Sequence, residues 1–152
     1  MNFQNLIFRK ATEADLSRII EMLHNDILGK DREVSDNFSN YKKAFDEIMA
    51  DKNNFLMVIE LEKEVIGTCH LTIMPSLTLQ GSKRMNIEAV RVDEKFSGQG
   101  IGSWMMQKAI EFAKNNEIKI VQLTTNKKRF DAHRFYERLG FEKTHEGMKL
   151  KI

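Results

Sequence analysis

The chain has 152 residues, of which 41% are hydrophobic and 30% charged, as expected for a globular protein with one core. Its formal net charge of +2 is too small to indicate a nucleic-acid-binding protein, because such domains gather basic residues on one face. The single cysteine, Cys69, excludes an internal disulfide framework, and no apolar run approaches the roughly 20 residues of a membrane span.

The N-terminal third predicts one strand followed by two helices. Leu6–Lys10 has the composition of a short strand. Thr12 then resembles a helix N-cap, with Asp15 at capping-box spacing, and apolar residues recur at helical spacing as far as Ile27. After a polar break, the pattern predicts a second helix over about Asp36–Asp51.

The middle of the chain predicts three strands. Phe55–Leu61 and Val65–Met74 are rich in apolar and β-branched residues, and the short polar stretch between them indicates a hairpin turn. Pro75–Arg84 predicts a polar loop, and Asn86–Asp93 predicts the next strand.

Three glycines at alternate positions, Gly98, Gly100 and Gly102, follow that strand and open an amphipathic helix that reaches about Asn116. A helix start carries free N–H groups and the positive end of the helix dipole. Glycines there let a phosphate approach without side-chain interference. We therefore interpret this turn as an anion site, and the alternative is a tight connection that needs glycine only for its dihedral angles.

The C-terminal part predicts a strand over Ile118–Thr125 and a helix over Asp131–Leu139, which Gly140 ends. Phe141–Thr144 and Met148–Ile152 have the pattern of a last hairpin. Antiparallel hairpins are thus mixed with a strand–helix–strand crossover. The predicted fold class is α+β (mixed α/β) in one domain over 1–152, not a doubly wound parallel sheet.

Two common phosphate-binding motifs do not fit the glycine turn. Counted from Gly98, the P-loop pattern places its second glycine on Ser103 and its lysine on Trp104. The dinucleotide fingerprint places its third glycine on Met105. Both mismatches argue against the hypothesis of a nucleotide-binding or phosphoryl-transfer protein.

A third motif fits. The segment from Ser97 to Gly102, SGQGIG, resembles the pattern Gln/Arg-x-x-Gly-x-Gly/Ala with which GNAT acetyltransferases bind acetyl-CoA. The upstream stretch IEAVRVDEKF and the downstream stretch DAHRFYERLGF, which ends at Phe141, also resemble that family. The chain departs from the pattern at Ser97, where Gln or Arg is usual. The resemblance implies a central, mostly antiparallel and splayed sheet flanked by about four helices.

The resemblance implies acetyl-CoA as the acyl donor and no metal. The backbone amides of the turn would receive the pyrophosphate, a neighbouring strand edge would pair with the pantetheine arm, and a polar side chain after the next strand would contact the pantetheine. For Asn126, a plain turn role is the alternative. The expected cofactor-binding residues are Val90, Arg91, Val92, Ser97, Gly98, Gln99, Gly100, Ile101, Gly102, Ser103 and Asn126.

Two residues are the catalytic candidates. Tyr136 matches the position of the family's general acid. A phenol with a pKa of about 10 stays protonated at neutral pH and can donate a proton to the leaving thiolate. The alternative is a tyrosine that only packs on the core. Strand alternation places Glu88 with Val90 and Val92, where burial would raise the carboxylate pKa toward that of a general base. The alternatives for Glu88 are pairing with Arg84 or Lys83 and an outward turn caused by a strand bulge. His70 or a water is the other candidate base.

The resulting hypothesis is a cytoplasmic enzyme that transfers acetyl directly to a primary amine of a small molecule or peptide. A non-catalytic CoA-binding sensor or regulatory module is the rival on the same fold. The expected partners include neither nucleic acid nor membrane, and a homodimer stays open. We expect the amine between the loops 29–40 and 75–84 and the splayed strands, where Asp26, Asp31 and Glu33 would attract a cationic substrate.

Overall fold

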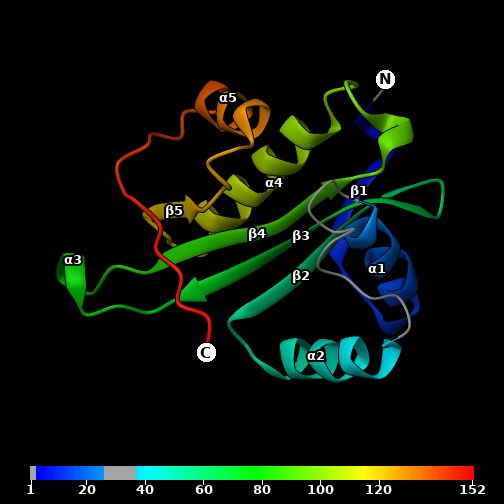
Figure 1. Cartoon of the computed structure of the whole chain (residues 1–152), viewed down its shortest axis with the longest axis horizontal. Helices are drawn as coiled ribbons and strands as arrows, with labels where there is room; N and C mark the ends of the chain where they lie inside the picture. Colours follow the sequence, from blue (N-terminus) through cyan, green and yellow to red (C-terminus); the bar gives the residue numbers. More distant parts are fainter. Residues whose placement is uncertain (1–2, 26–36) are drawn as a thin grey trace.

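A computed structural model describes residues 3–25 and 37–152 of the chain (Figure 1). Its described strands form one mixed sheet of five strands in the order β1-β2-β3-β4-β5. Neighbours from β1 to β4 are antiparallel, whereas β4 and β5 are parallel. The strands are β1 (Leu6–Lys10), β2 (Asn54–Leu61), β3 (Glu64–Met74), β4 (Arg84–Val92) and β5 (Ile120–Leu123).

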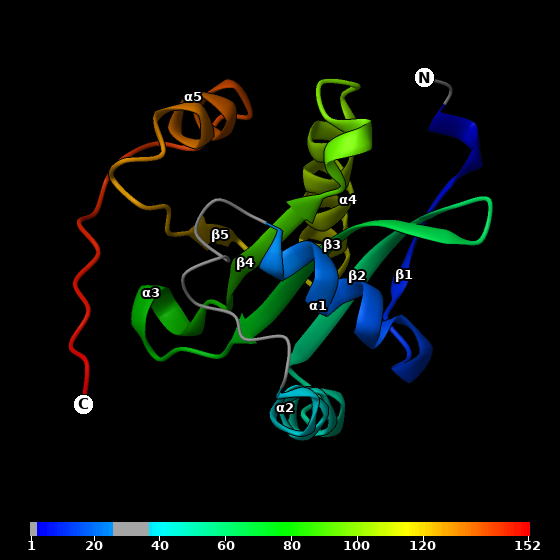
Figure 2. The ribbon, with the colours of Figure 1, turned by 45° about the vertical axis from the view of Figure 1, so that its right-hand side comes forward.

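Helices cover both faces of the sheet (Figure 2). α1 and α2 lie on one face, and α4 and α5 lie on the other. α3 is a single turn inside the loop predicted after β3, and Leu79 and Gln80 within it have left-handed dihedral angles. The helices are α1 (Leu16–His24), α2 (Phe38–Ala50), α3 (Thr78–Gly81), α4 (Ile101–Asn115) and α5 (Phe130–Arg138).

Alternation along the central strands builds two cores. On β2, Val58 packs with α1 and α2, whereas its neighbour Ile59 packs with α4, and both are fully buried. Met105 and Met106 of α4 are also fully buried. Because the sheet is packed on both faces, its position is fixed, and it forms a rigid support for residues at the ends of the strands.

The predicted fold class and most predicted elements are confirmed, but the prediction of a last hairpin is wrong. Residues 141–152 contain neither helix nor strand. Met148, Leu150 and Ile152 keep a strand-like alternation, yet they are 95%, 89% and 121% exposed. Alternation gives no stable strand without a neighbour to pair with, and among the described residues this segment has none.

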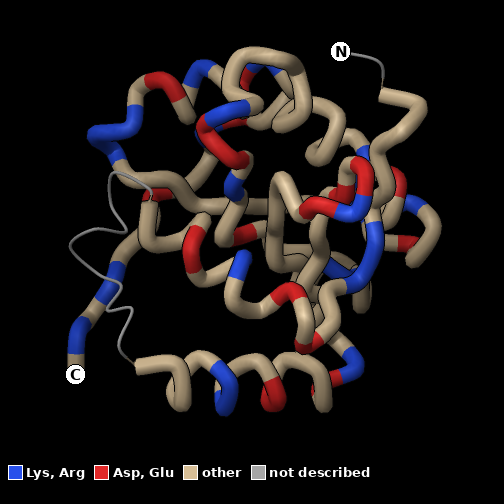
Figure 3. The backbone as a smooth tube through the Cα atoms, turned by 90° about the vertical axis from the view of Figure 1, so that its right-hand side faces the viewer, with Lys and Arg blue, Asp and Glu red and all other residues tan. Residues whose placement is uncertain are grey.

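Charges of both signs are interspersed along the backbone in the view of Figure 3, as the sequence composition implies. On α2, for example, Lys42 Nζ lies 2.6 Å from Asp46 Oδ1. In the part of the chain that the structure describes, no helix is long and apolar enough to cross a membrane.

The start of α1 is tied to the sheet by one buried carboxylate. Asp15 closes the predicted capping box by accepting a hydrogen bond from the Thr12 amide at 2.7 Å. The same carboxylate accepts two hydrogen bonds from Arg9 on β1, at 2.7 and 2.9 Å. Arg9 Nε also donates to Glu60 of β2 at 2.7 Å. A helix cap and two strands thus share one charged network.

Replacing Asp15 with Asn should lower the free energy of unfolding by about 2 kcal/mol at pH 7, because Arg9 loses its charged partner. Hydrogen bonding from Arg9 is the largest cause that lowers the pKa of Asp15 from its ordinary 3.8. The deficit should therefore be complete above that pKa and shrink as the pH falls below it. Urea unfolding at neutral and acidic pH measures this. Glu13→Gln, at an exposed neighbour, is the control, and equal losses in both variants would contradict the explanation.

Candidate functional site

The site begins at an irregularity in β4. His70 pairs with Glu88 and Thr68 pairs with Arg91, so Ala89 and Val90 together stand opposite the single residue Cys69. Ala89 has a φ of 51°, in the left-handed region. Two residues opposite one define a β-bulge, a feature that is enriched beside active sites.

This bulge reverses the predicted orientation of Glu88. Val90 and Val92 pack against the α4-side core, whereas Glu88 pairs with His70 on the α1 side, and its side chain is 58% exposed. The prediction that Glu88 shares an apolar face with Val90 and Val92 is therefore wrong, because the extra residue breaks the strand alternation. The alternative that a bulge turns Glu88 outward is what the structure shows.

The bulge also marks the point where β4 and β5 separate. Their parallel pairing ends at Ile87 and Leu123, and β4 continues past the end of β5 (Figure 1). The segment Val90–Val92 therefore has no strand partner on its β5 side among the described residues. Arg91 Nη1 donates to the Val90 carbonyl at 2.7 Å. The predicted splayed sheet and its open main-chain edge are both present.

The glycine turn connects β4 to α4 through two left-handed residues. Gly98 has a φ of 74°, and Gly100, the N-cap of α4, has a φ of 83°. The Trp104 amide donates to the Gly100 carbonyl at 3.0 Å, so the amides of Ile101, Gly102 and Ser103 come before the first helical hydrogen bond. We call the segment Ser97–Ser103 the cradle.

A cavity of about 330 Å³ opens at the cradle. A Cβ added at Gly102 would lie 3.5 Å from Phe135 Cζ, whereas one at Gly100 would lie 3.2 Å from Phe3 Cζ. The first position accepts a side chain at ordinary contact distance, and the second does not. The cavity is lined by Val92, Ser97, Gly98, Gly100, Ile101, Gly102, Ser103, Phe135 and Arg138.

Arg138, at the end of α5, is the cation that lines this cavity, and it was not among the residues expected from the sequence. The basic stretch Lys127–Arg129 does not line this cavity, and Lys127 Nζ lies 2.7 Å from Glu146. The sequence signal that could have indicated Arg138 is Gly140, because a glycine just past a helix end places Arg138 in the last turn of α5. An arginine beside free helix amides suits a phosphate ligand.

Two predicted cofactor contacts have local partners. Asn126 Oδ1 accepts the Lys128 amide at 2.9 Å, and its carbonyl accepts the Arg129 amide at 2.9 Å. The structure thus contains the turn that was the alternative for this residue, while its contact with pantetheine stays a prediction. Gln99 Nε2 donates to the Lys95 carbonyl at 3.2 Å, which ties the cradle to the residues that precede it.

Tyr136 lies between aromatic rings on the α4 side of the sheet. Its ring centroid is 5.0 Å from Phe135 and 5.9 Å from Phe141. Burial raises its pKa above the ordinary 10.0, although the positive charges of Arg129 and Arg91 oppose this. Its phenol therefore stays protonated at neutral pH. Burial also raises the pKa of Cys69 to about 12, so that thiol is not a nucleophile.

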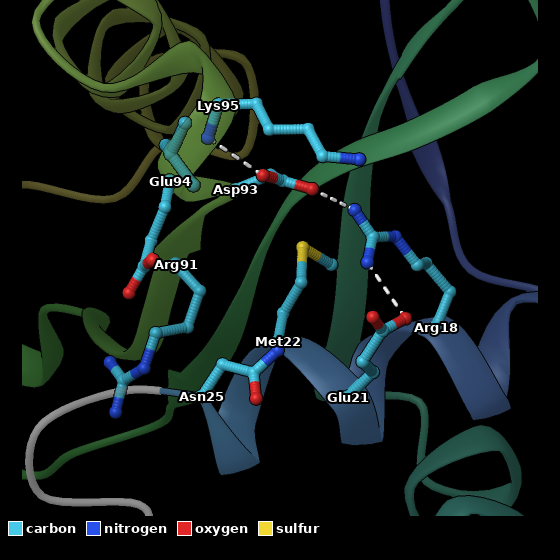
Figure 4. A pocket seen from close by; sticks show the side chains of 9 residues that line it. Arg18, Glu21, Met22, Asn25, Arg91, Asp93, Glu94 and Lys95 are labelled. Atoms are coloured by element: carbon cyan, nitrogen blue, oxygen red, sulfur yellow. Dashed lines mark hydrogen bonds and ion pairs between the residues drawn. The ribbon is translucent and has the colours of Figure 1, made fainter.

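A second cavity, of about 250 Å³, lies on the opposite side of β4 beneath α1 (Figure 4). Arg18 bridges it, pairing with Asp93 and, at 2.7 Å, with Glu21. Met22 and Asn25 also line it. Val92 lines both cavities, which lie on either side of the end of β4. The predicted acceptor residues Asp26, Asp31 and Glu33 lie outside the described residues.

Residues 20–141 match the family model described as the acetyltransferase (GNAT) family. The chain belongs to the GNAT acetyltransferase family. Its members use acetyl-CoA, and the chain is accordingly an acyltransferase. This membership confirms the resemblance drawn from the cradle and from the segment around Tyr136.

Two relatives that are named N-acetyltransferases agree with this family assignment. An uncharacterized N-acetyltransferase of Methanocaldococcus jannaschii is 29% identical over 93% of this chain, which spans only 65% of that relative's length. The aminoalkylphosphonate N-acetyltransferase of Salmonella typhimurium is 28% identical, over 88% of this chain and 80% of its own. A solved structure from Bacillus halodurans C-125, described as a transcriptional regulator, is 46% identical with a TM-score of 0.93 and covers 97% of this chain and 99% of its own.

Gly102→Asp should weaken acetyl-CoA binding at least tenfold, because a carboxylate at the helix start competes with phosphate for the same amides. The contact of 3.5 Å for an added Cβ leaves room for it, and the fold should persist. Isothermal titration with acetyl-CoA measures the Kd. Gly102→Asn is the matched neutral control and should lose far less affinity. Equal losses in the two variants would show that size, not charge, is responsible.

Proposed function

We propose that this chain, acting as a single cytoplasmic domain, transfers acetyl from acetyl-CoA directly to a primary amine of a small molecule or peptide. The observation that carries the proposal is the open edge of Val90–Val92 beside the free amides at the start of α4. That arrangement suits a ligand with an amide-bearing arm at one end and phosphates at the other, which is the chemistry of CoA.

The described residues fit the proposed cofactor. The amides of Ile101, Gly102 and Ser103 and the guanidinium of Arg138 would hold the pyrophosphate. The main chain of Val90–Val92 would pair with the amides of the pantetheine arm, as an added strand pairs with a sheet edge. When bound, acetyl-CoA supplies the activated acetyl group. Ser97 provides no cation at the position where the family usually has Gln or Arg, and Arg138 offers positive charge from another element.

The catalytic roles follow from the two faces of β4. Glu88, exposed on the α1 side, would take a proton from the incoming ammonium, directly or through a water. Tyr136, on the α4 side with its pKa raised, would donate a proton to the departing thiolate sulfur. The ammonium would thus meet a base, Glu88 of β4, and the leaving thiolate would meet an acid, Tyr136 of α5, on opposite sides of the sheet.

The proposed acceptor enters from the α1 side. The cavity beneath α1 shares the lining residue Val92 with the cavity at the cradle, and the ion-paired groups Arg18, Glu21 and Asp93 make it polar. A small polar amine fits this setting, and the aminoalkylphosphonate acetyltransferase among the relatives supports that class.

A thiol-release screen with acetyl-CoA tests the function. Polyamines, amino acids, aminoglycosides, aminoalkylphosphonates and peptide N-termini are the acceptors to compare. Release above the rate without acceptor, together with a thermal shift on adding acetyl-CoA, is the expected result. Binding of acetyl-CoA with no release for any acceptor class would contradict the proposed catalysis, and no thermal shift would contradict the proposed cofactor.

Tyr136→Phe should lower kcat about 100-fold or more, because the thiolate loses its proton donor. The acetyl-CoA Kd should stay within about twofold, since the phenyl ring keeps its aromatic contacts. Steady-state kinetics and titration calorimetry give both values. Tyr41→Phe, at the other tyrosine of the chain, is the control and should leave both unchanged. A parallel loss of Kd and kcat would instead indicate a packing role for Tyr136.

A further inference from the structure

Three polar side chains from three neighbouring strands meet beside the β4 bulge, on the α1 face. His70 of β3 lies between Asn54 of β2 and Glu88 of β4. Its Nε2 is 2.8 Å from Asn54 Oδ1, and its Nδ1 is 3.5 Å from Glu88 Oε1. The His70 side chain is only 13% exposed, whereas that of Glu88 is 58% exposed. The histidine is thus enclosed, and the carboxylate faces solvent.

The Asn54 amide is oriented with its carbonyl oxygen toward the His70 ring, and this orientation assigns the hydrogen of neutral His70. A carbonyl oxygen only accepts, so His70 Nε2 donates to Asn54 Oδ1. Thr72 Oγ1 donates to the same oxygen at 3.0 Å. The lone pair of His70 Nδ1 is then directed toward the Glu88 carboxylate. His70 Nδ1 and Glu88 Oε1 are then both hydrogen-bond acceptors, and a proton between them would complete a hydrogen bond.

We propose that His70 and Glu88 together hold the proton that leaves the acceptor ammonium, and that Asn54 is a positioning residue that keeps His70 Nδ1 ready to receive it. This inference rests on the proposed acetyl transfer. Glu88, the exposed member, meets the amine, and His70 acts through Glu88. The proton removed in each turnover completes a hydrogen bond that the resting pair lacks.

The proposed step balances. One ammonium N–H bond breaks, and its proton passes to Glu88 and settles between Oε1 and His70 Nδ1. The amine lone pair forms the C–N bond to the acetyl carbon as the C–S bond breaks. The sulfur receives a proton from Tyr136, which regains one from the same nitrogen. The proton on the His70–Glu88 pair leaves to solvent through the exposed carboxylate.

The surroundings keep the resting pair without its proton at neutral pH. Burial lowers the pKa of His70 from its ordinary 6.5, and the charge of Glu88 opposes this. Among the described residues, Glu88 on β4 is the only charged group that acts on His70, and Asn54 and Thr72 contribute neutral dipoles. Because the two groups face each other, they titrate as one system and not as separate residues.

Nitrogen NMR of the His70 ring tests the pair without any acceptor. At about pH 8 the wild type should carry hydrogen on Nε2 only, since the ring is then neutral. Asn54→Asp should raise the apparent pKa of the ring by about one unit, because a carboxylate favours imidazolium. Glu88→Gln should lower it. Thr72→Val removes the second hydrogen bond to Asn54 but not its contact with His70, and it serves as the matched control with little change.

Kinetics then connect the pair to turnover. The kcat–pH profile is measured with an acceptor found in the thiol-release screen. In Asn54→Asp the apparent pKa of its acidic limb should rise by the same amount as the apparent pKa of the His70 ring. His70→Gln should lower kcat about 100-fold at neutral pH, with the acetyl-CoA Kd unchanged. Such a split between kcat and cofactor affinity is not expected of a residue that only supports the fold.

Several results would overturn the proposal. Hydrogen on His70 Nδ1 in the wild type at alkaline pH would do so, as would a ring titration that Asn54→Asp leaves unchanged. A kcat–pH profile that is identical in the wild type, Asn54→Asp and His70→Gln would also reject it. If no amine is acetylated, the proposed function fails, whereas the ring titration still decides whether the pair exists.

Discussion

The extra residue in β4 is the constraint on which the rest of the site depends. With Ala89 and Val90 opposite Cys69, the strand changes which side chains face which layer of helices. Glu88 and Arg91 come to the α1 face, and Val90 and Val92 come to the α4 face. Ala89 adopts a left-handed φ of 51°, which costs an L-residue roughly 1–2 kcal/mol. The chain keeps this conformation where β4 leaves β5, and one distortion thus orients the side chains and opens the edge.

Packing on both faces holds this distortion in place. Cys69 opposite the bulge is fully buried, and Ile87 just before it is 1% exposed. Close-packed cores allow little movement of the strand between them. The cradle is fixed at its other end, where Gly102 approaches Phe135 of α5. The two ends of the proposed cofactor site therefore lie on elements that the cores position independently of any ligand.

Local patterns in the sequence predicted most of the fold. Helical periodicity located α1, α2 and α4, and Gly98 and Gly100 are at left-handed positions, which glycine favours. The side on which Glu88 lies was not predictable from alternation, because the bulge falls on Ala89, a residue with no preference for a left-handed φ. Arg138 was missed because its place beside the cradle depends on how α5 docks. The prediction of a last hairpin was wrong because alternation indicates a strand but does not show whether a partner strand is available.

The burial of Cys69 has a consequence for the chemistry of detection. It is the only cysteine in the chain, it is fully buried, and its pKa of about 12 keeps it protonated. Thiol-specific reagents react with accessible thiolates, so the folded protein contributes almost no colour of its own when they are added. Unfolding exposes this one sulfur. The same reagent would therefore count the free CoA released in the proposed reaction and, in denaturant, would count unfolded molecules.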